Sequence, residues 1–301
     1  MTVGRGRLLA AHVVLILMCL AGTAAAQRPT DFSSFVIKTT PVAAGVYQME
    51  SPVAGNTAVF VGADGVVLVD PQYAPMHQRL VDAVRKLSSR PIRFLVNTHF
   101  HNDHSEGNEL LAKLGVVIIS HENVRTFLAT GKAAGPGQRL VLPSPPAALP
   151  MVTYSDSLTL HFNRDEIFIF HPGVAHTDAD SIVHFRRANI IHAGDIVTRL
   201  HERYPNINSG LIAAVGRMLK LANADTKFVT GHGPVATFKD VQDFHRMMVT
   251  IRDRVVAGIQ AGKTVEQIIA SKPTAEFDAA YKGRTTPEDL VRRVYEEFAK
   301  R

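Results

Sequence analysis

The residues of this chain best suited to chemistry lie in one stretch, Thr98–His104, which reads Thr-His-Phe-His-Asn-Asp-His. It contains the pattern His-x-His-x-Asp-His, formed by His99, His101, Asp103 and His104. Imidazole and carboxylate are ligands that Zn²⁺ and similar borderline ions prefer. A polar loop rich in histidine is the alternative, but this density of ligand types favours a metal site.

A strand must deliver these ligands to the site. The apolar run Ile92–Val96 reads as a buried strand, so the ligands leave its C-terminal end on a loop. His99 and His101 are two positions apart and can point the same way in an extended segment. Asp103 and His104 follow across a turn, so they can face a second point nearby.

Three further ligand candidates, His176, Asp195 and His232, each follow a short apolar run that reads as a strand. A glycine near each of them lets the backbone turn and approach a ligand closely. Taken alone, each could be a capped turn or a core residue. Taken with the first motif, they form a consistent set of metal ligands.

Strand-like and helical patterns fill both halves of the chain, with helices following each set of strands. This order predicts two β-sheets packed together under outer helices. Residues 131–150, rich in Gly, Pro and Ala, are expected to form an irregular connection. The strands are expected at 35–38, 46–49, 57–61, 66–69, 92–96, 116–119, 158–162, 167–170, 182–185, 189–191 and 228–229. The helices are expected at 78–87, 106–114, 122–128, 210–222, 241–261, 265–270 and 287–300.

The N-terminus has the order of charged, apolar and small residues that is typical of a secretory signal peptide. Arg5 and Arg7 precede a largely apolar run at 8–20, and Ala24–Ala26 offers a cleavage site. That run is too short to span a bilayer. We therefore expect a signal peptide at 1–26, a single domain at 27–301, secretion to the periplasm, and no membrane anchor after cleavage.

Loss of residues 1–26 would remove the only cysteine, Cys19, and two arginines, taking the formal charge from +6 to +4. The mature chain would then have no disulfide, thiolate ligand or cysteine nucleophile. Its basic residues are spread along the sequence, whereas nucleic-acid binding calls for a clustered basic surface. No nucleic-acid partner is expected.

Four motifs together resemble the metallo-β-lactamase superfamily, over about residues 35 to 255. They are T-H-F-H-N-D-H, A-H-T-D-A-D, A-G-D and G-H-G-P, in the family's order and approximate spacing. The resemblance implies an α/β fold, the αββα sandwich of two mixed β-sheets flanked by helices. It places the active site along one edge of the two sheets.

The resemblance also implies a cofactor of two Zn²⁺ ions per chain. The first ion would be bound by His99, His101 and His176, the second by Asp103, His104 and His232, with Asp195 bridging both. Asp103 and Asp195 are the candidate catalytic residues. Two zinc ions, two carboxylates and a bridging hydroxide leave one residual positive charge, which favours an anionic tetrahedral intermediate.

Asp195 discriminates among branches of the superfamily. An aspartate bridge is similar to that of the glyoxalase II, lactonase and general esterase branches, whereas the best-known β-lactamases have Cys or Ser at this place. Di-iron relatives have Glu in place of the second histidine of the first motif, so His101 argues against that branch.

The resemblance therefore favours an exported binuclear zinc hydrolase of a small-molecule acyl substrate. A metal-bridging hydroxide would attack the carbonyl of an ester, thioester, lactone or amide. One alternative is a true metallo-β-lactamase that hydrolyses β-lactams. Another is a periplasmic metal-binding accessory protein without useful turnover.

Three further features around the ligands are candidates for supporting roles. Asp70 resembles the family aspartate that supports the ligand loop, although it could also be a turn residue before Pro71. Asn102 could donate to a developing oxyanion or cap the turn. The segment Thr198–Gly210 follows the predicted bridging aspartate and is expected to line the substrate pocket.

Overall fold

The computed structural model describes residues 31–131, 141–200, 202–283 and 285–300. The predicted signal peptide lies outside the described residues. Among the helices of the described part, none is long and apolar enough to cross a membrane.

The first sheet has seven strands in the order β1-β2-β3-β4-β5-β6-β7. Neighbouring strands from β1 to β4 are antiparallel, and those from β4 to β7 are parallel. The central strand β4 is buried along its whole length, as expected for a strand covered on both faces. The bounds are β1 Lys38–Ala43, β2 Val46–Glu50, β3 Thr57–Gly62, β4 Gly65–Val69, β5 Ile92–Val96, β6 Val117–His121 and β7 Val152–Tyr154.

The second sheet has six strands in the order β13-β12-β11-β10-β9-β8. Strand β11 pairs with β12 in parallel, and all the other pairs are antiparallel. Because β9 and β11 both run antiparallel to β10, the C-terminal ends of β9, β11 and β12 meet at one edge. The bounds are β8 Ser157–Phe162, β9 Asp165–Phe170, β10 Ile182–Phe185, β11 Ile190–His192, β12 Lys227–Val229 and β13 Ala236–Thr237.

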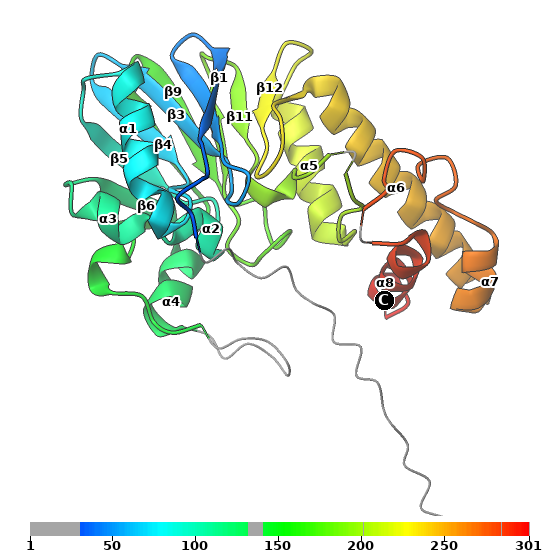
Figure 1. Ribbon diagram of the computed structural model, residues 1–301. Helices are drawn as coiled ribbons and strands as arrows, with labels where there is room; N and C mark the ends of the chain where they lie inside the picture. The colour runs from blue at the N-terminus through cyan, green and yellow to red at the C-terminus, as the bar shows by residue number, and fades with distance from the viewer. Residues whose placement is uncertain (1–30, 132–140, 201, 284, 301) are drawn as a thin grey trace, which may run out of the picture. The chain divides into compact units, whose positions relative to one another are not determined.

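Helices cover the outer face of each sheet, α1 and α3 on one side and α5 and α6 on the other (Figure 1). Packing follows these layers: Val69, Ile169 and Phe185 belong to a buried cluster between the sheets, whereas Leu68 packs with Leu80 of α1. The two sheets and their outer helices form the αββα sandwich that the sequence predicts. The α-helices are α1 His77–Leu87, α2 Asn102–Ser105, α3 Asn108–Ala112, α4 Glu122–Thr130, α5 Ser209–Leu221, α6 Phe238–Gln260, α7 Val265–Ala270 and α8 Pro287–Phe298.

The edge strands differ most from the expected elements. Strand β1 spans Lys38–Ala43 rather than residues 35–38, because its pairing with β2 begins at Lys38, opposite Glu50. The short edge strands β7 and β13 were not predicted, since their two or three residues carry no periodic pattern. The ligand stretch is also partly helical, as α2.

Candidate metal centre

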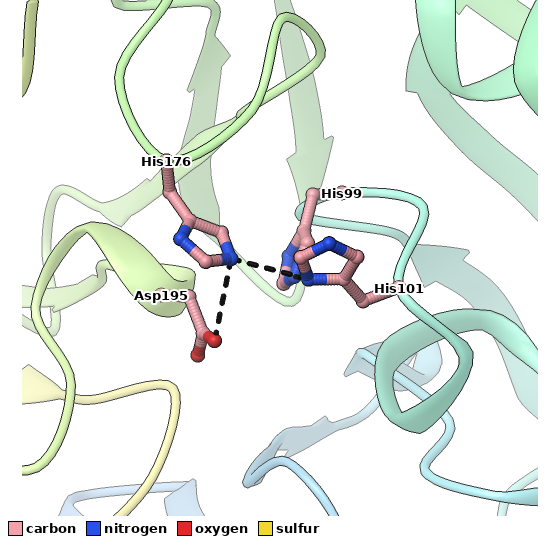
Figure 2. A group of neighbouring side chains, drawn as sticks. All are labelled: His99, His101, His176 and Asp195. Atoms are coloured by element: carbon pink, nitrogen blue, oxygen red, sulfur yellow. Dashed lines mark hydrogen bonds and ion pairs between the residues drawn. The ribbon is translucent and has the colours of Figure 1, made fainter. Parts of the chain in front are cut away.

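All seven predicted ligand residues lie together at the sheet edge, in two neighbouring groups. One group contains His99, His101, His176 and Asp195 (Figure 2), and the other Asp103, His104 and His232. Within each group, the ligand atoms lie within 4.8 Å of one another. The first motif contributes to both groups, as its spacing predicts.

In the first group, three imidazoles converge on one point. Nδ1 of His101 lies 3.0 Å from Nε2 of His99 and 3.1 Å from Nε2 of His176. Oδ2 of Asp195 lies 3.5 Å from Nε2 of His176 (Figure 2).

In the second group, Nε2 of His232 lies 3.4 Å from Nε2 of His104 and 3.2 Å from Oδ2 of Asp103. The other carboxylate oxygen of Asp195, Oδ1, is 3.5 Å from Nε2 of both His104 and His232. Asp195 therefore directs one oxygen toward each group.

These separations fit ligands around a metal ion. With metal–nitrogen distances of about 2.0–2.1 Å, tetrahedral ligands lie about 3.3 Å apart. Oδ1 of Asp195 is buried and has no hydrogen-bond partner among the described residues. A bound metal ion would supply the missing partner. A Cβ atom added at Gly231 would collide with this oxygen, and one at Gly55 with the ring of His104, so both backbones must approach the site closely.

Asp70 orients two of the imidazoles. Its Oδ1 accepts a hydrogen bond from the Thr98 backbone N–H, and its Oδ2 accepts from the Thr98 hydroxyl and from Nδ1 of His104, each at 2.7 Å. Because the Thr98 hydroxyl donates to Asp70, it is free to accept from Nδ1 of His99, 2.9 Å away. Both imidazoles then present Nε2 to the site. This supporting role matches the one expected from the resemblance.

The His176 turn is held by Asp180, which sequence reasoning did not single out. The buried carboxylate of Asp180 accepts from the backbone N–H groups of His176 and Thr177 at 2.6 and 2.8 Å, and from the Thr177 hydroxyl at 2.6 Å. Burial raises the pKa of Asp180 to about 6. The only sequence signal was its place at the end of the A-H-T-D-A-D motif.

The loop that carries His232 is tied to the first sheet. Nδ2 of Asn56 donates to the carbonyls of Thr230 and Gly233, at 2.9 and 2.8 Å, and Nε2 of Gln48 donates to Gly233 at 3.0 Å. Asn56 and Gln48 are fully buried and lie far from this loop in the sequence. No motif marked them.

The electrostatics of the site favour ionised carboxylates and mostly neutral imidazoles. Burial lowers the pKa of His99 and His101, and lowers that of His176 to about 4. Burial acts against the charge on Asp195 too, but the neighbouring imidazoles His104 and His232 outweigh it and lower the pKa of the carboxyl.

His104 behaves differently. Burial lowers its pKa, but Asp70 and Asp195 more than compensate and raise it to about 10. A metal ion at this position would have to displace the proton on Nε2, while Nδ1–H stays bonded to Asp70.

A cavity of about 220 Å³ opens beside His176 and Asp195. Thr198, Tyr204 and Asn206 line it, which confirms that the segment after Asp195 forms a pocket wall. Asn102 is the exposed first residue of α2, and the helix cap position before it belongs to His101.

The family model described as the metallo-beta-lactamase superfamily matches residues 51–232, more than half of the chain. The chain belongs to this superfamily. All seven predicted ligands lie inside the matched segment. The resemblance seen in the four motifs is thereby confirmed, as is the fold it implies.

Individual proteins similar to this chain are named as metallo-beta-lactamases or as a sec-alkylsulfatase. The chain is 23% identical over 145 residues to a metallo-beta-lactamase type 2 of Elizabethkingia meningoseptica. This match covers 48% of the chain and 53% of the relative, so it spans about half of the relative's length. A metallo-beta-lactamase from Pontibacter korlensis aligns with a TM-score of 0.58 and 17% identity, over 70% of this chain and 98% of the other. The sec-alkylsulfatase Pisa1 from Pseudomonas sp. aligns with a TM-score of 0.67 and 14% identity, over 87% and 50%. Such structural likenesses establish the fold alone.

Proposed function

We propose that this superfamily hydrolase is a binuclear zinc enzyme that cleaves a small ester, thioester, lactone or amide. The observation that carries the proposal is the position of Asp195, whose two oxygens face the two ligand groups. A carboxylate that faces both groups can hold two ions close together, as two-metal hydrolases require.

Zinc bound here would act as a Lewis acid and lower the pKa of a bound water toward about 7. The protein residues supply the geometry for that chemistry. Asp70 and Thr98 fix the orientation of His99 and His104, and Asp180 fixes the turn of His176. Such fixed ligands need little rearrangement during the reaction.

β-Lactam hydrolysis is a second candidate, because the curated relative named above is a metallo-beta-lactamase. The aspartate at position 195 favours the acyl ester, thioester or lactone instead, by resemblance to the aspartate-bridged branches. We further propose export to the periplasm, from Arg5, Arg7 and the apolar run that follows them.

Metal content and turnover on the same preparations would test the proposal. We expect two zinc ions per chain by elemental analysis, and hydrolysis of at least one member of a panel of 4-nitrophenyl esters, thioesters, lactones and a chromogenic cephalosporin. Asp195→Asn should lose zinc and turnover together. One iron and no zinc at full activity would contradict the zinc enzyme, and full zinc occupancy without turnover of any acyl compound would favour the accessory protein.

A further inference from the structure

Four of the seven ligands lie on one short segment, which begins at Asn97 and ends at His104. Its first two ligands, His99 and His101, belong to one group, and its last two, Asp103 and His104, belong to the other. On this side of the site, the separation of the two groups therefore depends on the conformation of a single segment. A shift at either end of the segment would move one group relative to the other.

The side chain of Asn97 joins the two ends of this ligand segment. Its Nδ2 donates to the carbonyl of His104 at 3.0 Å, while its backbone N–H donates to Ile119 of β6 at 3.0 Å. The carbonyl of His104 depends on a partner from outside α2, because this helix is only one turn long. Asp70 accepts a hydrogen bond from the ring of the same histidine. His104 is thus held at its backbone by Asn97 and at its ring by Asp70.

A second asparagine, Asn108 of α3, fixes the orientation of the Asn97 amide. Both side chains are fully buried, and each Nδ2 donates to the Oδ1 of the other at 2.9 Å. The other N–H of Asn108 donates to the carbonyl of Ala148 at 3.0 Å, as that of Asn97 does to His104. A rotated amide would place its oxygen against a carbonyl oxygen, so the hydrogen bonds permit only this orientation of the pair.

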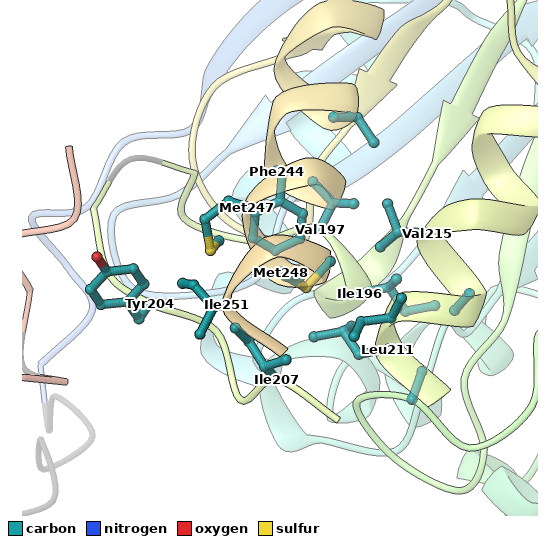
Figure 3. Packing of buried hydrophobic residues seen from close by; sticks show 14 of the residues in the cluster. Ile196, Val197, Tyr204, Ile207, Leu211, Val215, Phe244, Met247, Met248 and Ile251 are labelled. Atoms are coloured by element: carbon teal, nitrogen blue, oxygen red, sulfur yellow. The ribbon is translucent and has the colours of Figure 1, made fainter. Parts of the chain in front are cut away.

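The residues that His104 must meet are fixed by other parts of the fold. Asp195 is followed directly by Ile196, which is buried in the cluster formed with α5 and α6 (Figure 3). The loop that carries His232 is held by the side chain of Asn56. Nε2 of His104 lies 3.5 Å from Oδ1 of Asp195 and 3.4 Å from Nε2 of His232. These distances are kept only if the end of the ligand segment is placed correctly.

We propose that Asn97 is a positioning residue for the second zinc ion, the one held by Asp103, His104 and His232. It acts through the carbonyl of His104. The inference rests on the binuclear zinc function proposed above. Without the hydrogen bond from Asn97, the last two ligands of the segment would be free to move relative to the first two. The site would then hold the first ion much more tightly than the second.

Two matched substitutions would test this role. Asn97→Asp removes both hydrogen bonds that the Asn97 amide donates, including the one to His104. Asn108→Asp removes both that the Asn108 amide donates, including the one to Ala148. Each variant keeps the bond that its oxygen accepts, so the two changes are alike in burial, charge and lost bonds. Only Asn97→Asp loses a bond to a ligand residue, and Asn108→Asp is therefore its control.

Competition with a chromogenic zinc chelator would give a Kd for each of the two ions. We expect Asn97→Asp to weaken binding of the second ion about tenfold to hundredfold, the range for a residue that supports a metal ligand, and to leave the first unchanged. In Asn108→Asp, both Kd values should match those of the wild type. Turnover of Asn97→Asp should recover as free zinc is raised, because the ligands of the second ion are still present.

Asn97→Ser and Asn108→Ser repeat the comparison without an added charge, should a buried carboxylate prevent folding. Urea unfolding of the metal-free proteins should show a similar loss of stability in the two variants of each pair, so that a difference in zinc affinity reports on the ligand segment. Equal weakening of the second ion within a pair, or none in the variants of Asn97, would overturn the inference alone. A wild-type protein that binds only one zinc ion would overturn the binuclear function and the inference with it.

Discussion

Asp70 shows how one buried residue can control the site without facing a metal ion. Its carboxylate accepts from Nδ1 of His104 and from Thr98, and it is fully buried. In Asp70→Asn, the amide nitrogen can take the position of Oδ2, where its N–H would face Nδ1–H of His104. The imidazole would then lose the acceptor that fixes its tautomer. We expect zinc affinity or turnover to fall about tenfold to hundredfold.

Competition of the variant with a chromogenic zinc chelator, together with turnover, would measure this loss. Asp253→Asn, a substitution at an exposed aspartate on α6, is the control and should leave both unchanged. Wild-type zinc affinity and turnover in Asp70→Asn would contradict the supporting role.

The buried side chain of His192 leads to a prediction of how the stability of the fold depends on pH. It is fully buried, and burial lowers its pKa to about 4 from an ordinary value of 6.5. A lowered histidine pKa means that the unfolded chain binds the proton more readily, so this stabilisation is present above pH 6.5 and is lost as the pH falls toward 4. The loss should reach about 3 kcal/mol.

His192→Asn should remove this contribution, while its side-chain oxygen can still accept from Gly194 N–H as Nδ1 of His192 does. Urea unfolding of the metal-free wild type and variant at several pH values would measure it. The difference between their free energies of unfolding should shrink from pH 7 to pH 4, whatever the variant's absolute stability. A constant difference would contradict the assignment.

At the scale of elements, the loop after β12 is held in place by Asn56, the residue directly before β3. Asn56 donates to two carbonyls of this loop and its backbone N–H donates to a third, that of Gly231, at 2.8 Å. Asn56→Ala would leave the buried Thr230 carbonyl without its side-chain donor, at a cost of about 1–3 kcal/mol, whereas the partly buried Gly233 carbonyl keeps its bond from Gln48. The looser His232 would also bind zinc more weakly.

Urea unfolding and zinc competition on Asn56→Ala would test this. Gln78→Ala is the control. It removes an exposed hydrogen bond from the side-chain amide of Gln78 on α1, and should change the free energy of unfolding by less than about 0.5 kcal/mol. If Asn56→Ala has the same free energy of unfolding and the same zinc affinity as the control, the loop does not need these hydrogen bonds.

Elements with strong periodicity were predictable from the sequence, and contacts across the fold were not. The predicted bounds of β5, β10 and α7 match the structure to the residue. The seven candidate ligands could be picked out as one set because their types and positions after strands carry a chemical signal, and the family resemblance divided them between two ions. Asn56 and Gln48 carry none, because their roles depend on which distant segments the sheets bring to the same edge.

At the scale of the whole molecule, the ligand groups join residues from both sheets. Bound zinc should therefore stabilise the folded state, by about 4 kcal/mol when its free concentration is a thousand times its Kd. For a chain of this size, the gain corresponds to roughly 10 °C in Tm. Calorimetry with zinc and with a chelator would measure it, and His101→Ala should shrink the difference. An unchanged Tm in protein shown to contain zinc would contradict this coupling.

The sequence separation within the second group also has a kinetic consequence. His104 and His232 are 128 positions apart, and their rings meet only when both sheets are in place. Contacts between such distant segments form late, after the loop-closure entropy has been overcome. Zinc should therefore slow unfolding and leave the refolding rate nearly unchanged, since an interaction absent from the transition state acts on the unfolding rate alone. Stopped-flow refolding and unfolding with and without zinc would reveal this asymmetry. Bound zinc would then set the lifetime of the folded protein.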